Sequence, residues 1–285
     1  MPTYAVTGAT GRLGRLVIEQ LLDTGVPAAE IAAIVRTPEK AADLAARGVE
    51  IRQANYDDPS TLPGALAGTR RLLLISGDTP GQRVAQHTAV VDAAKLAGVE
   101  RLAYTSILHA DTTTNPLAPE HKATEEVIAA SGLAYTILRN GWYTENYTDQ
   151  LPQYLQTGTI RGATGGARVS VATRADFAAA AVAALTGEED GNAVHELGGT
   201  ALTFDELAAT VTEVTGTTVV HQDLSAAELA SALEKVGLDA GTAGFVAALD
   251  TSIAIGELVT DSGDLERLIG RPSTPLRDAV RAALA

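Results

Sequence analysis

The first half of the chain alternates short apolar runs with longer stretches in which apolar residues recur at helical spacing. Continuous apolar runs of this length are typical of strands that are buried on both faces of a parallel sheet. The amphipathic stretches between them are long enough to be the helices that connect parallel strands. The pattern therefore predicts an α/β fold built on a parallel sheet. The predicted strands cover 4–6, 31–35, 49–54, 71–76, 101–106 and 134–138.

Beyond about residue 150 the alternation weakens and helical patterns predominate. Two short runs at 159–161 and 168–171 flank a glycine-rich turn, which predicts an extended excursion or a hairpin. We therefore divide the chain into a larger domain over 1–150 and a smaller, mostly helical α/β lobe over 151–285. We expect this lobe to cover a substrate and not to fold independently.

Three glycines mark the step from the first predicted strand to the first predicted helix. Gly8, Gly11 and Gly14 follow the run 4–6, and an amphipathic pattern continues directly from them. In such a unit the first glycine permits the turn, the second lets backbone approach a pyrophosphate, and the third lets the helix pack closely. The phosphates then face the free N–H groups and the positive end of the helix dipole. The sequence thus predicts a doubly wound, Rossmann-type domain that binds a dinucleotide.

The end of the second predicted strand selects the dinucleotide. A carboxylate at this position would bind the ribose hydroxyls of NAD, whereas an arginine suits the 2′-phosphate of NADP. Arg36 stands there, and Arg12 and Lys40 are candidates to assist it. A solvated arginine at a strand end is the alternative interpretation. We predict NADPH as the cofactor, in preference to NADH.

The charge balance argues against a nucleic-acid partner. The chain has 35 acidic and 21 basic residues and a net charge of −14, whereas binding to phosphate backbones requires concentrated positive charge. Cysteine is absent, which excludes disulfides and thiolate catalysis and is compatible with a reducing cytoplasm. No apolar run approaches the roughly 18 residues of a membrane span, and no basic-then-apolar leader precedes the first strand. We expect a cytoplasmic protein with no membrane partner. Its oligomeric state stays open, with a homodimer as one alternative.

The tyrosines do not supply the general base of alcohol oxidation. Short-chain dehydrogenases that oxidise alcohols place a lysine four residues after a tyrosine, and none of the seven tyrosines here has one. Quinone reduction demands less, because hydride enters an electron-poor ring and the resulting anion takes a proton from water or a weak acid. An apolar slot with one or two hydrogen-bond donors suffices.

An aromatic cluster after the sixth predicted strand is the candidate for this slot. Three of the chain's eleven aromatic residues fall within 142–147. Asn140 and Gly141, beside Trp142 and Tyr143, would contribute the donors. Ligands of open α/β sheets bind beyond the carboxyl ends of the strands, where this cluster is predicted to lie. An aromatic plug between two lobes is the alternative.

These motifs together resemble the NmrA-like group of atypical short-chain dehydrogenases. The likeness covers nearly the full chain, and its most specific part is Arg-Asn-Gly-Trp-Tyr at 139–143. It implies a flavin-independent reductase that uses NADPH, with a quinone or another small planar molecule as acceptor. Reduction of triphenylmethane dyes, and NADP(H) sensing by a regulatory protein without catalysis, are the alternatives that we retain. The segments that carry the resemblance are 7–14, 33–36, 72–76, 103–106 and 138–147.

The resemblance also implies roles for individual residues. The glycine turn would hold the pyrophosphate, Arg36 the 2′-phosphate, residues 76–78 the ribose side, and residues 140–145 the nicotinamide. The implied cofactor-binding residues are Gly8, Ala9, Thr10, Gly11, Arg12, Leu13, Gly14, Arg36, Ser76, Gly77, Asp78, Asn140, Gly141, Trp142, Tyr143, Thr144 and Glu145.

Three residues are candidates for the reaction itself, namely Asn140, Tyr143 and His121. His121 stands where many members of the group have a lysine, and the neighbouring Lys122 is out of register by one. Histidine titrates near neutral pH, so His121 could donate a proton; a surface histidine near a helix N-terminus is the alternative. No two histidines have ligand spacing with a third imidazole or carboxylate, so we expect no metal site.

Overall fold

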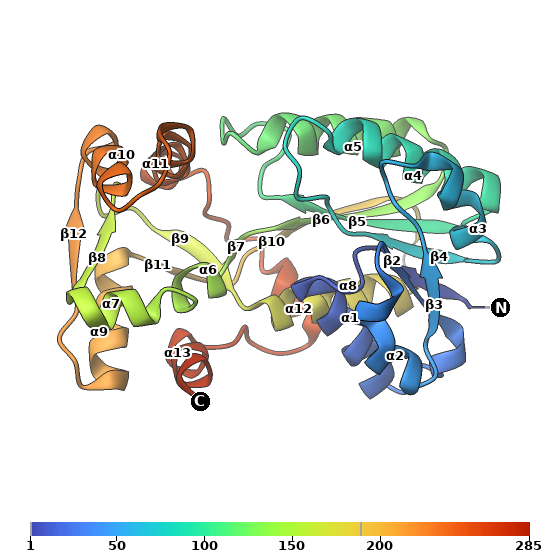
Figure 1. The fold of residues 1–285 in the computed structure, drawn as a ribbon, viewed down its shortest axis with the longest axis horizontal. Helices are drawn as coiled ribbons and strands as arrows, with labels where there is room; N and C mark the ends of the chain where they lie inside the picture. The colour runs from blue at the N-terminus through green and yellow to red at the C-terminus, as the bar shows by residue number, and fades with distance from the viewer. Residues whose placement is uncertain (1, 189) are drawn as a thin grey trace. The chain divides into compact units, whose positions relative to one another are not determined.

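The computed structural model describes residues 2–188 and 190–285 (Figure 1). Its contacts divide the chain into two compact units that interleave along the sequence. The first unit contains the chain up to Ala110, then Pro119–Asn140 and Arg174–His195. The second contains Asp111–Ala118, Gly141–Thr173 and Glu196–Ala285. The boundary near residue 150 that the sequence suggests falls within the middle segment of the second unit.

The first unit is built around a seven-stranded sheet with the order β10-β6-β5-β4-β1-β2-β3. Every pairing among β1 to β6 is parallel. The order therefore changes direction at β1, which is the arrangement of a doubly wound sheet, and the predicted Rossmann-type fold is confirmed. The strands are β1 Tyr4–Val6, β2 Ile31–Val35, β3 Glu50–Gln53, β4 Arg71–Leu74, β5 Arg101–Ile107, β6 Ala134–Asn140 and β10 Ala193–Leu197.

Helices of the first unit pack in pairs beside this sheet. Helix α1 packs against α8, which comes from the second half of the sequence, and α3 packs against α4. The helices are α1 Arg12–Asp23, α2 Ala42–Ala46, α3 Leu62–Leu66, α4 Arg83–Ala97, α5 Ala118–Ala130 and α8 Arg174–Thr186. Single 3₁₀ turns precede β2, α2 and α3 at Ala28–Glu30, Pro38–Ala41 and Pro59–Thr61.

The central strands explain why the sequence adopts this fold. Leu72, Leu74, Leu102 and Tyr104 are fully buried and pack in one cluster with Val90 of α4. Each fully buried apolar side chain of this size stabilises the fold by roughly 1.5–3 kcal/mol. Because both faces of β4 and β5 are covered, their residues read as continuous apolar runs in the sequence.

The second unit combines short strands with most of the remaining helices. Strands β11-β9-β7 form one small sheet, and β12 and β8 form a parallel pair. The strands are β7 Trp142–Tyr143, β8 Thr159–Gly162, β9 Val169–Ala172, β11 Thr200–Leu202 and β12 Val220–Asp223. The helices are α6 Glu145–Thr148, α7 Leu151–Thr157, α9 Phe204–Thr215, α10 Ala226–Lys235, α11 Ala240–Ala254, α12 Asp264–Ile269 and α13 Leu276–Leu284.

The hairpin expected between 159–161 and 168–171 does not form. Strand β8 pairs in parallel with β12, from Thr159 opposite Val220 onward. Strand β9 instead pairs with β7 and β11. Of the two alternatives the hairpin was wrong, because each run pairs with a strand elsewhere in the chain, which the local turn signal does not reveal.

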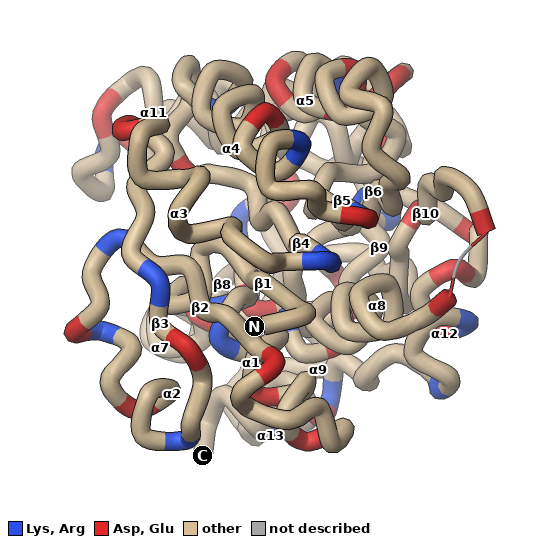
Figure 2. Tube along the Cα trace, turned by 90° about the vertical axis from the view of Figure 1, so that its right-hand side faces the viewer, with Lys and Arg blue, Asp and Glu red and all other residues tan. Residues whose placement is uncertain are grey.

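Two general surface properties complete the description. Acidic and basic positions are interspersed along the elements, with acidic ones more numerous (Figure 2). Within residues 2–188 and 190–285, no helix combines the length and apolar character that crossing a membrane requires.

Packing of α1 on the β1 turn leaves no space for a side chain at Gly14. A Cβ there would meet the carbonyl oxygen of Gly8, and would lie 2.9 Å from Cα of Ala9. Both neighbours are backbone atoms, so Gly14→Ala should lower the free energy of unfolding by about 2 kcal/mol or more. Denaturation in urea measures this change.

Gly64 of α3 is the matched control, because a Cβ there has no neighbour within 4 Å. Gly64→Ala should be neutral or stabilising by up to about 1 kcal/mol, since alanine is the better helix former. Equal stabilities for the two variants would contradict the close approach of α1 to the turn.

Candidate functional site

The glycine turn presents the N-terminus of α1 without a side-chain cap. Gly8 has a φ of +59°, a conformation that favours glycine, and its carbonyl accepts the N–H of Gly11 at 2.9 Å. Gly11 is the N-cap residue of the 12-residue helix α1 and makes no capping side-chain bond. The backbone N–H groups of the first helical turn therefore remain available to an anion.

A cavity of 430 Å³ opens in the first unit at this turn. Its lining comes from segments that follow the carboxyl ends of β1, β2, β3 and β4, as the position of a dinucleotide in a doubly wound sheet requires. The lining residues are Gly8, Thr10, Gly11, Arg12, Leu13, Gly14, Ile34, Val35, Arg36, Lys40, Ala54, Asn55, Tyr56, Asp57, Ile75, Ser76, Gly77, Asp78, Thr79 and Gln86.

Positive charge gathers at one part of this lining. Arg12, Arg36 and Lys40 are exposed and line the cavity. Arg36 forms no ion pair with a described side chain; only its carbonyl is engaged, by the amide of Gln53 at 3.2 Å. Arg15, one turn into α1, is by contrast bound to Asp43 and lowers the pKa of that carboxyl. Arg36 is therefore the guanidinium that stays available at the end of β2.

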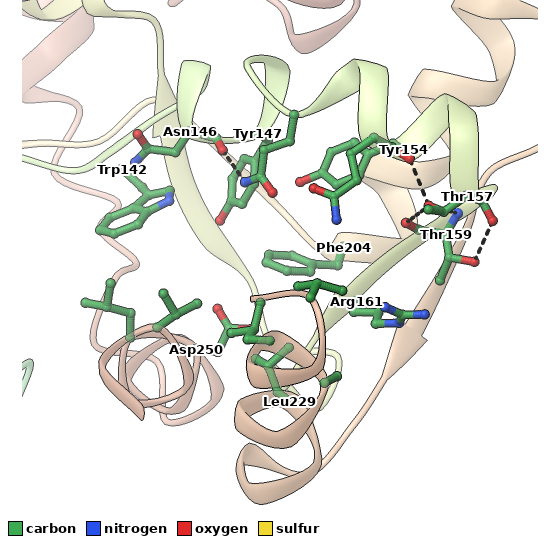
Figure 3. Close-up of a pocket in the computed structure, with 17 residues that line it drawn as sticks. Trp142, Asn146, Tyr147, Tyr154, Thr157, Thr159, Arg161, Phe204, Leu229 and Asp250 are labelled. Atoms are coloured by element: carbon green, nitrogen blue, oxygen red, sulfur yellow. Dashed lines mark hydrogen bonds between the residues drawn. The ribbon is translucent and has the colours of Figure 1, made fainter. Parts of the chain in front are cut away.

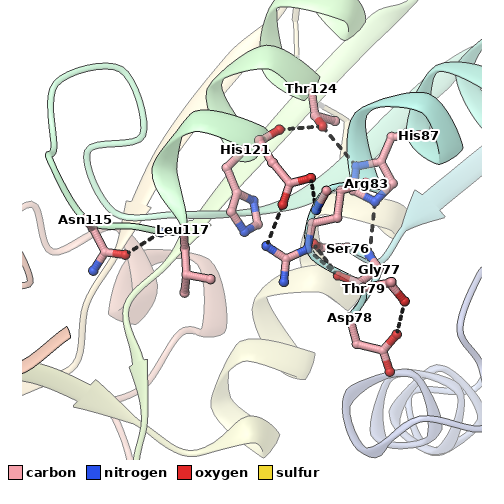
Figure 4. A network of polar contacts seen from close by, with 12 residues as sticks. Ser76, Gly77, Asp78, Thr79, Arg83, His87, Asn115, Leu117, His121 and Thr124 are labelled. Carbon is pink, nitrogen blue, oxygen red and sulfur yellow. Dashed lines mark hydrogen bonds and ion pairs between the residues drawn. The ribbon is translucent and has the colours of Figure 1, made fainter. Parts of the chain in front are cut away.

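The loop after β4 is fixed by a buried histidine of α4 (Figure 4). The N–H of Gly77 donates to Nε2 of His87 at 3.0 Å, so the imidazole hydrogen is on Nδ1, 2.9 Å from Oγ1 of Thr124. Nε of Arg83 donates to the Gly77 carbonyl at 2.6 Å. Burial, and then the charge of Arg83, lower the pKa of His87 to about 4. A neutral His87 thus holds the peptide that lines the cavity at 76–79.

His121 lies close to this network, in the interior. It is 5% exposed, and its Nδ1 is 2.8 Å from the hydroxyl of Tyr104. Burial, followed by the charges of Arg83 and His87, lowers the pKa of His121 to about 3. From the sequence, His121 is a candidate proton donor because histidine titrates near neutral pH. With its pKa lowered to about 3, the imidazole of His121 is uncharged at pH 7. It is also not the surface histidine of the alternative interpretation.

Asn140 ends β6 with an acceptor that has no partner. Its side chain is 6% exposed, and Oδ1 is buried without a hydrogen bond to any described residue. The adjacent Arg139 forms two hydrogen bonds with Glu125 of α5, at 2.7 and 3.1 Å, which fix the end of this strand. An unsatisfied buried acceptor favours a ligand donor at this position.

The residues that follow belong to the second unit. The N–H of Gly141 donates to the carbonyl oxygen of Leu197 at 2.7 Å, so it is not the free donor that the sequence suggested. Trp142 and Tyr143 form β7 opposite Val171 and Ala172. Thr144 is buried and Glu145 begins α6. Trp142 lines a second cavity, which belongs wholly to this unit (Figure 3).

Ten of the twenty residues that line the first cavity are among the predicted cofactor-binding residues, and Lys40, named as a helper of Arg36, is one more. Of the predicted residues in the glycine turn, only Ala9 does not line the cavity; it is buried and its N–H is 3.3 Å from the carbonyl of Ile34. Asn55–Asp57 and Gln86 are not among the residues predicted from the sequence. The position of Asn55–Asp57 shortly after the end of β3 was a signal that could have identified them. Gln86 joins the lining because its amide donates to Asp57 at 2.7 Å. The support that His87 gives to the loop had no sequence signal.

No group of three or more histidine, aspartate or glutamate side chains suited to a metal ion occurs among residues 2–188 and 190–285. The lining of the first cavity combines backbone N–H groups of the glycine turn, three cationic side chains and polar loop residues. These features suit a ligand that carries several phosphates.

Comparisons with known proteins agree with this geometry. Residues 8–188 match a protein family described as NAD(P)H-binding. Quinone oxidoreductase 2 of Escherichia coli (strain K12) is 49% identical to the chain, over 97% of this chain and 96% of that protein.

Two solved structures share the whole fold. The NADPH-dependent quinone oxidoreductase of Escherichia coli in complex with NADPH has a TM-score of 0.95 and 48% identity, covering 99% of this chain and 100% of its own. The triphenylmethane reductase of Citrobacter sp. has a TM-score of 0.94 and 42% identity, covering 99% of each chain. The chain therefore belongs to the NAD(P)H-binding, NmrA-like family that its motifs indicate.

Proposed function

We propose that this chain is an NADPH-dependent, flavin-independent reductase that transfers hydride to a quinone or a similar planar, electron-poor acceptor. The observation that carries the proposal is the uncapped glycine turn with Arg36 at the end of β2, in a chain 49% identical to a quinone oxidoreductase. The likeness to triphenylmethane reductase keeps bulky dyes as a second class of acceptor to be assayed. A regulator that senses NADP(H) without catalysis is not favoured by these relatives.

The residues of the first cavity fit NADPH. The N–H groups at Gly11 and the start of α1 would bind the pyrophosphate. Arg36, assisted by Arg12 and Lys40, would bind the 2′-phosphate, because a guanidinium pairs with two phosphate oxygens at once. The loop Ser76–Asp78, held by His87, would border the ribose.

The nicotinamide end is assigned to the residues after β6. The buried Oδ1 of Asn140 would accept a hydrogen bond from the carboxamide, which would orient the ring. By the family resemblance, we also assign Gly141 to Glu145 to the nicotinamide, with Tyr143 beside the ring. NADPH supplies the hydride, and the chain's residues supply position and exclusion of water.

The proton that completes the reaction comes from water in this proposal. Hydride addition to a quinone gives a hydroquinone anion, and one proton converts this anion to the hydroquinone. His121 is neutral at pH 7 and hydrogen-bonded to Tyr104, so it has no imidazolium proton to give. We assign it to positioning Tyr104 and the adjoining part of the site.

The first test is turnover. The purified protein should consume NADPH when a benzoquinone or naphthoquinone is added without flavin, as followed by the loss of NADPH absorbance. A cationic triphenylmethane dye in place of the quinone tests the second acceptor class by loss of colour. Binding of NADPH with no turnover of any of these acceptors would favour the regulatory alternative instead.

Arg36 should determine the choice of cofactor. Arg36→Ala should raise KM for NADPH by about tenfold or more and leave KM for NADH almost unchanged, because only NADPH carries the 2′-phosphate. Steady-state kinetics with both cofactors measure this ratio. Arg47→Ala is the control, since Arg47 is exposed, lies outside the cavity and has only a 3.9 Å ion pair with Asp23. An equal rise for both cofactors would remove Arg36 from this role.

The rate should show no histidine titration. An imidazolium donor with an ordinary pKa would make kcat fall as the pH rises through about 6.5. Because the pKa of His121 is lowered to about 3, kcat should instead be level between about pH 5.5 and 8. A step near pH 6.5 that disappears in His121→Gln would show that His121 is the proton donor after all.

A further inference from the structure

The second unit contains a cavity of its own, which shares only Trp142 with the residues assigned to the nicotinamide. Its volume is 240 Å³, and every residue that lines it belongs to the second unit. It shares no lining residue with the dinucleotide cavity. Helices α6, α7, α10 and α11 contribute most of its walls (Figure 3).

Aromatic rings form one side of this cavity. Trp142, Tyr147, Tyr154 and Phe204 line it, and the rings of Tyr147 and Phe204 meet edge to face with centroids 5.2 Å apart. Figure 3 shows the Tyr147 ring pointing from α6 into the space beside Phe204. Aliphatic side chains of α10 and α11, such as Leu229, cover the opposite side. Such a lining suits a flat, largely apolar molecule.

Two polar groups of this cavity, the hydroxyl of Tyr147 and the carboxyl of Asp250, have capacity to bind a further group. Tyr147 is 6% exposed, and its hydroxyl is buried with no hydrogen bond to any described residue. Asp250 of α11 accepts the N–H of Ala163 at 2.8 Å but forms no ion pair with a described side chain. The nearby His221, whose charge acts to lower the pKa of Asp250, has its Nδ1 3.0 Å from a carboxylate oxygen of Asp205. Burial raises the pKa of Asp250 to about 6, so the carboxyl is mostly ionised at neutral pH.

The two charged residues of the lining differ in exposure. Arg161 is exposed on β8, where solvent screens its charge, whereas Asp250 is partly buried beside the rings. The field inside the cavity is therefore that of a carboxylate and of ring faces, both of which attract positive charge. An ammonium group could bind Asp250 and donate a hydrogen bond to the Tyr147 hydroxyl oxygen.

We propose that this cavity is a second ligand site, which binds a small aromatic molecule carrying an ammonium group. The ring would lie against Trp142 and Phe204, and the ammonium group would pair with Asp250 and Tyr147. This site shares Trp142 with the proposed nicotinamide site and no residue with the dinucleotide cavity, and its test measures binding without any quinone turnover.

Titration calorimetry of the full chain with a matched pair of probes tests it. Tryptamine carries the ammonium group, and tryptophol replaces that group with a hydroxyl on the same indole frame. Tryptamine should bind saturably and about tenfold or more tighter than tryptophol, because only tryptamine carries the charge. Equal affinities for the two probes, or no saturable binding of tryptamine, would overturn the proposal.

Two variants locate the binding. Asp250→Asn keeps an acceptor for the N–H of Ala163 but removes the charge, so tryptamine should bind it no better than tryptophol does. Tyr147→Phe removes only the hydroxyl and should weaken tryptamine binding by about twofold to fivefold. Unchanged tryptamine affinity in Asp250→Asn would place the probe elsewhere and refute the site.

NADPH binding separates a local effect from misfolding. Both variants should bind NADPH as the unaltered chain does, since neither residue lies in the first cavity. If Asp250→Asn does not fold, Tyr147→Phe and the two probes on the unaltered chain still decide the outcome. Failure of quinone turnover would leave these binding results untouched.

Discussion

The close approach of two backbone segments, α1 and the turn after β1, is the constraint on which the first unit depends. Gly14 sits against the carbonyl of Gly8 with no space for a Cβ. This contact brings the helix N-terminus to the carboxyl end of β1, where the order of the sheet changes direction. In the proposed function, this backbone geometry alone would provide the surface that binds the pyrophosphate, before any side chain contributes. In the same proposal, the cationic side chains and the loop after β4 would add selectivity for the cofactor.

The architecture of the first unit was readable from the sequence because its signals are local. Strands buried on both faces give continuous apolar runs, and the glycines mark the first turn, so the Rossmann-type sheet followed directly. Pairings between distant segments were not readable. The pairing of β8 with β12 joins residues about sixty positions apart, and nothing in 159–171 distinguishes that partner from an adjacent strand. The place of α8 beside α1 likewise depends on tertiary packing.

The site shows the same division between local and non-local information. Arg36 and the glycine turn were identified because their positions relative to a strand end carry the chemistry. We expected an ordinary pKa for His121 because a sequence shows the residue type but not the surroundings of the side chain. Burial beside Tyr104, together with the charge of Arg83, reverses that expectation. The support of Gly77 by His87 and the raised pKa of Asp250 depend equally on burial, which only the folded chain reveals.

The interleaving of the two units has a consequence for the order of synthesis. The strand β10, at one edge of the seven-stranded sheet, and the helix α8, beside α1, both lie after residue 173. When only the first 150 residues have been synthesised, every segment that lines the first cavity is therefore present, yet one edge of β6 is still unpaired. The seven-stranded sheet is completed only when β10 has been synthesised, nearly fifty residues later.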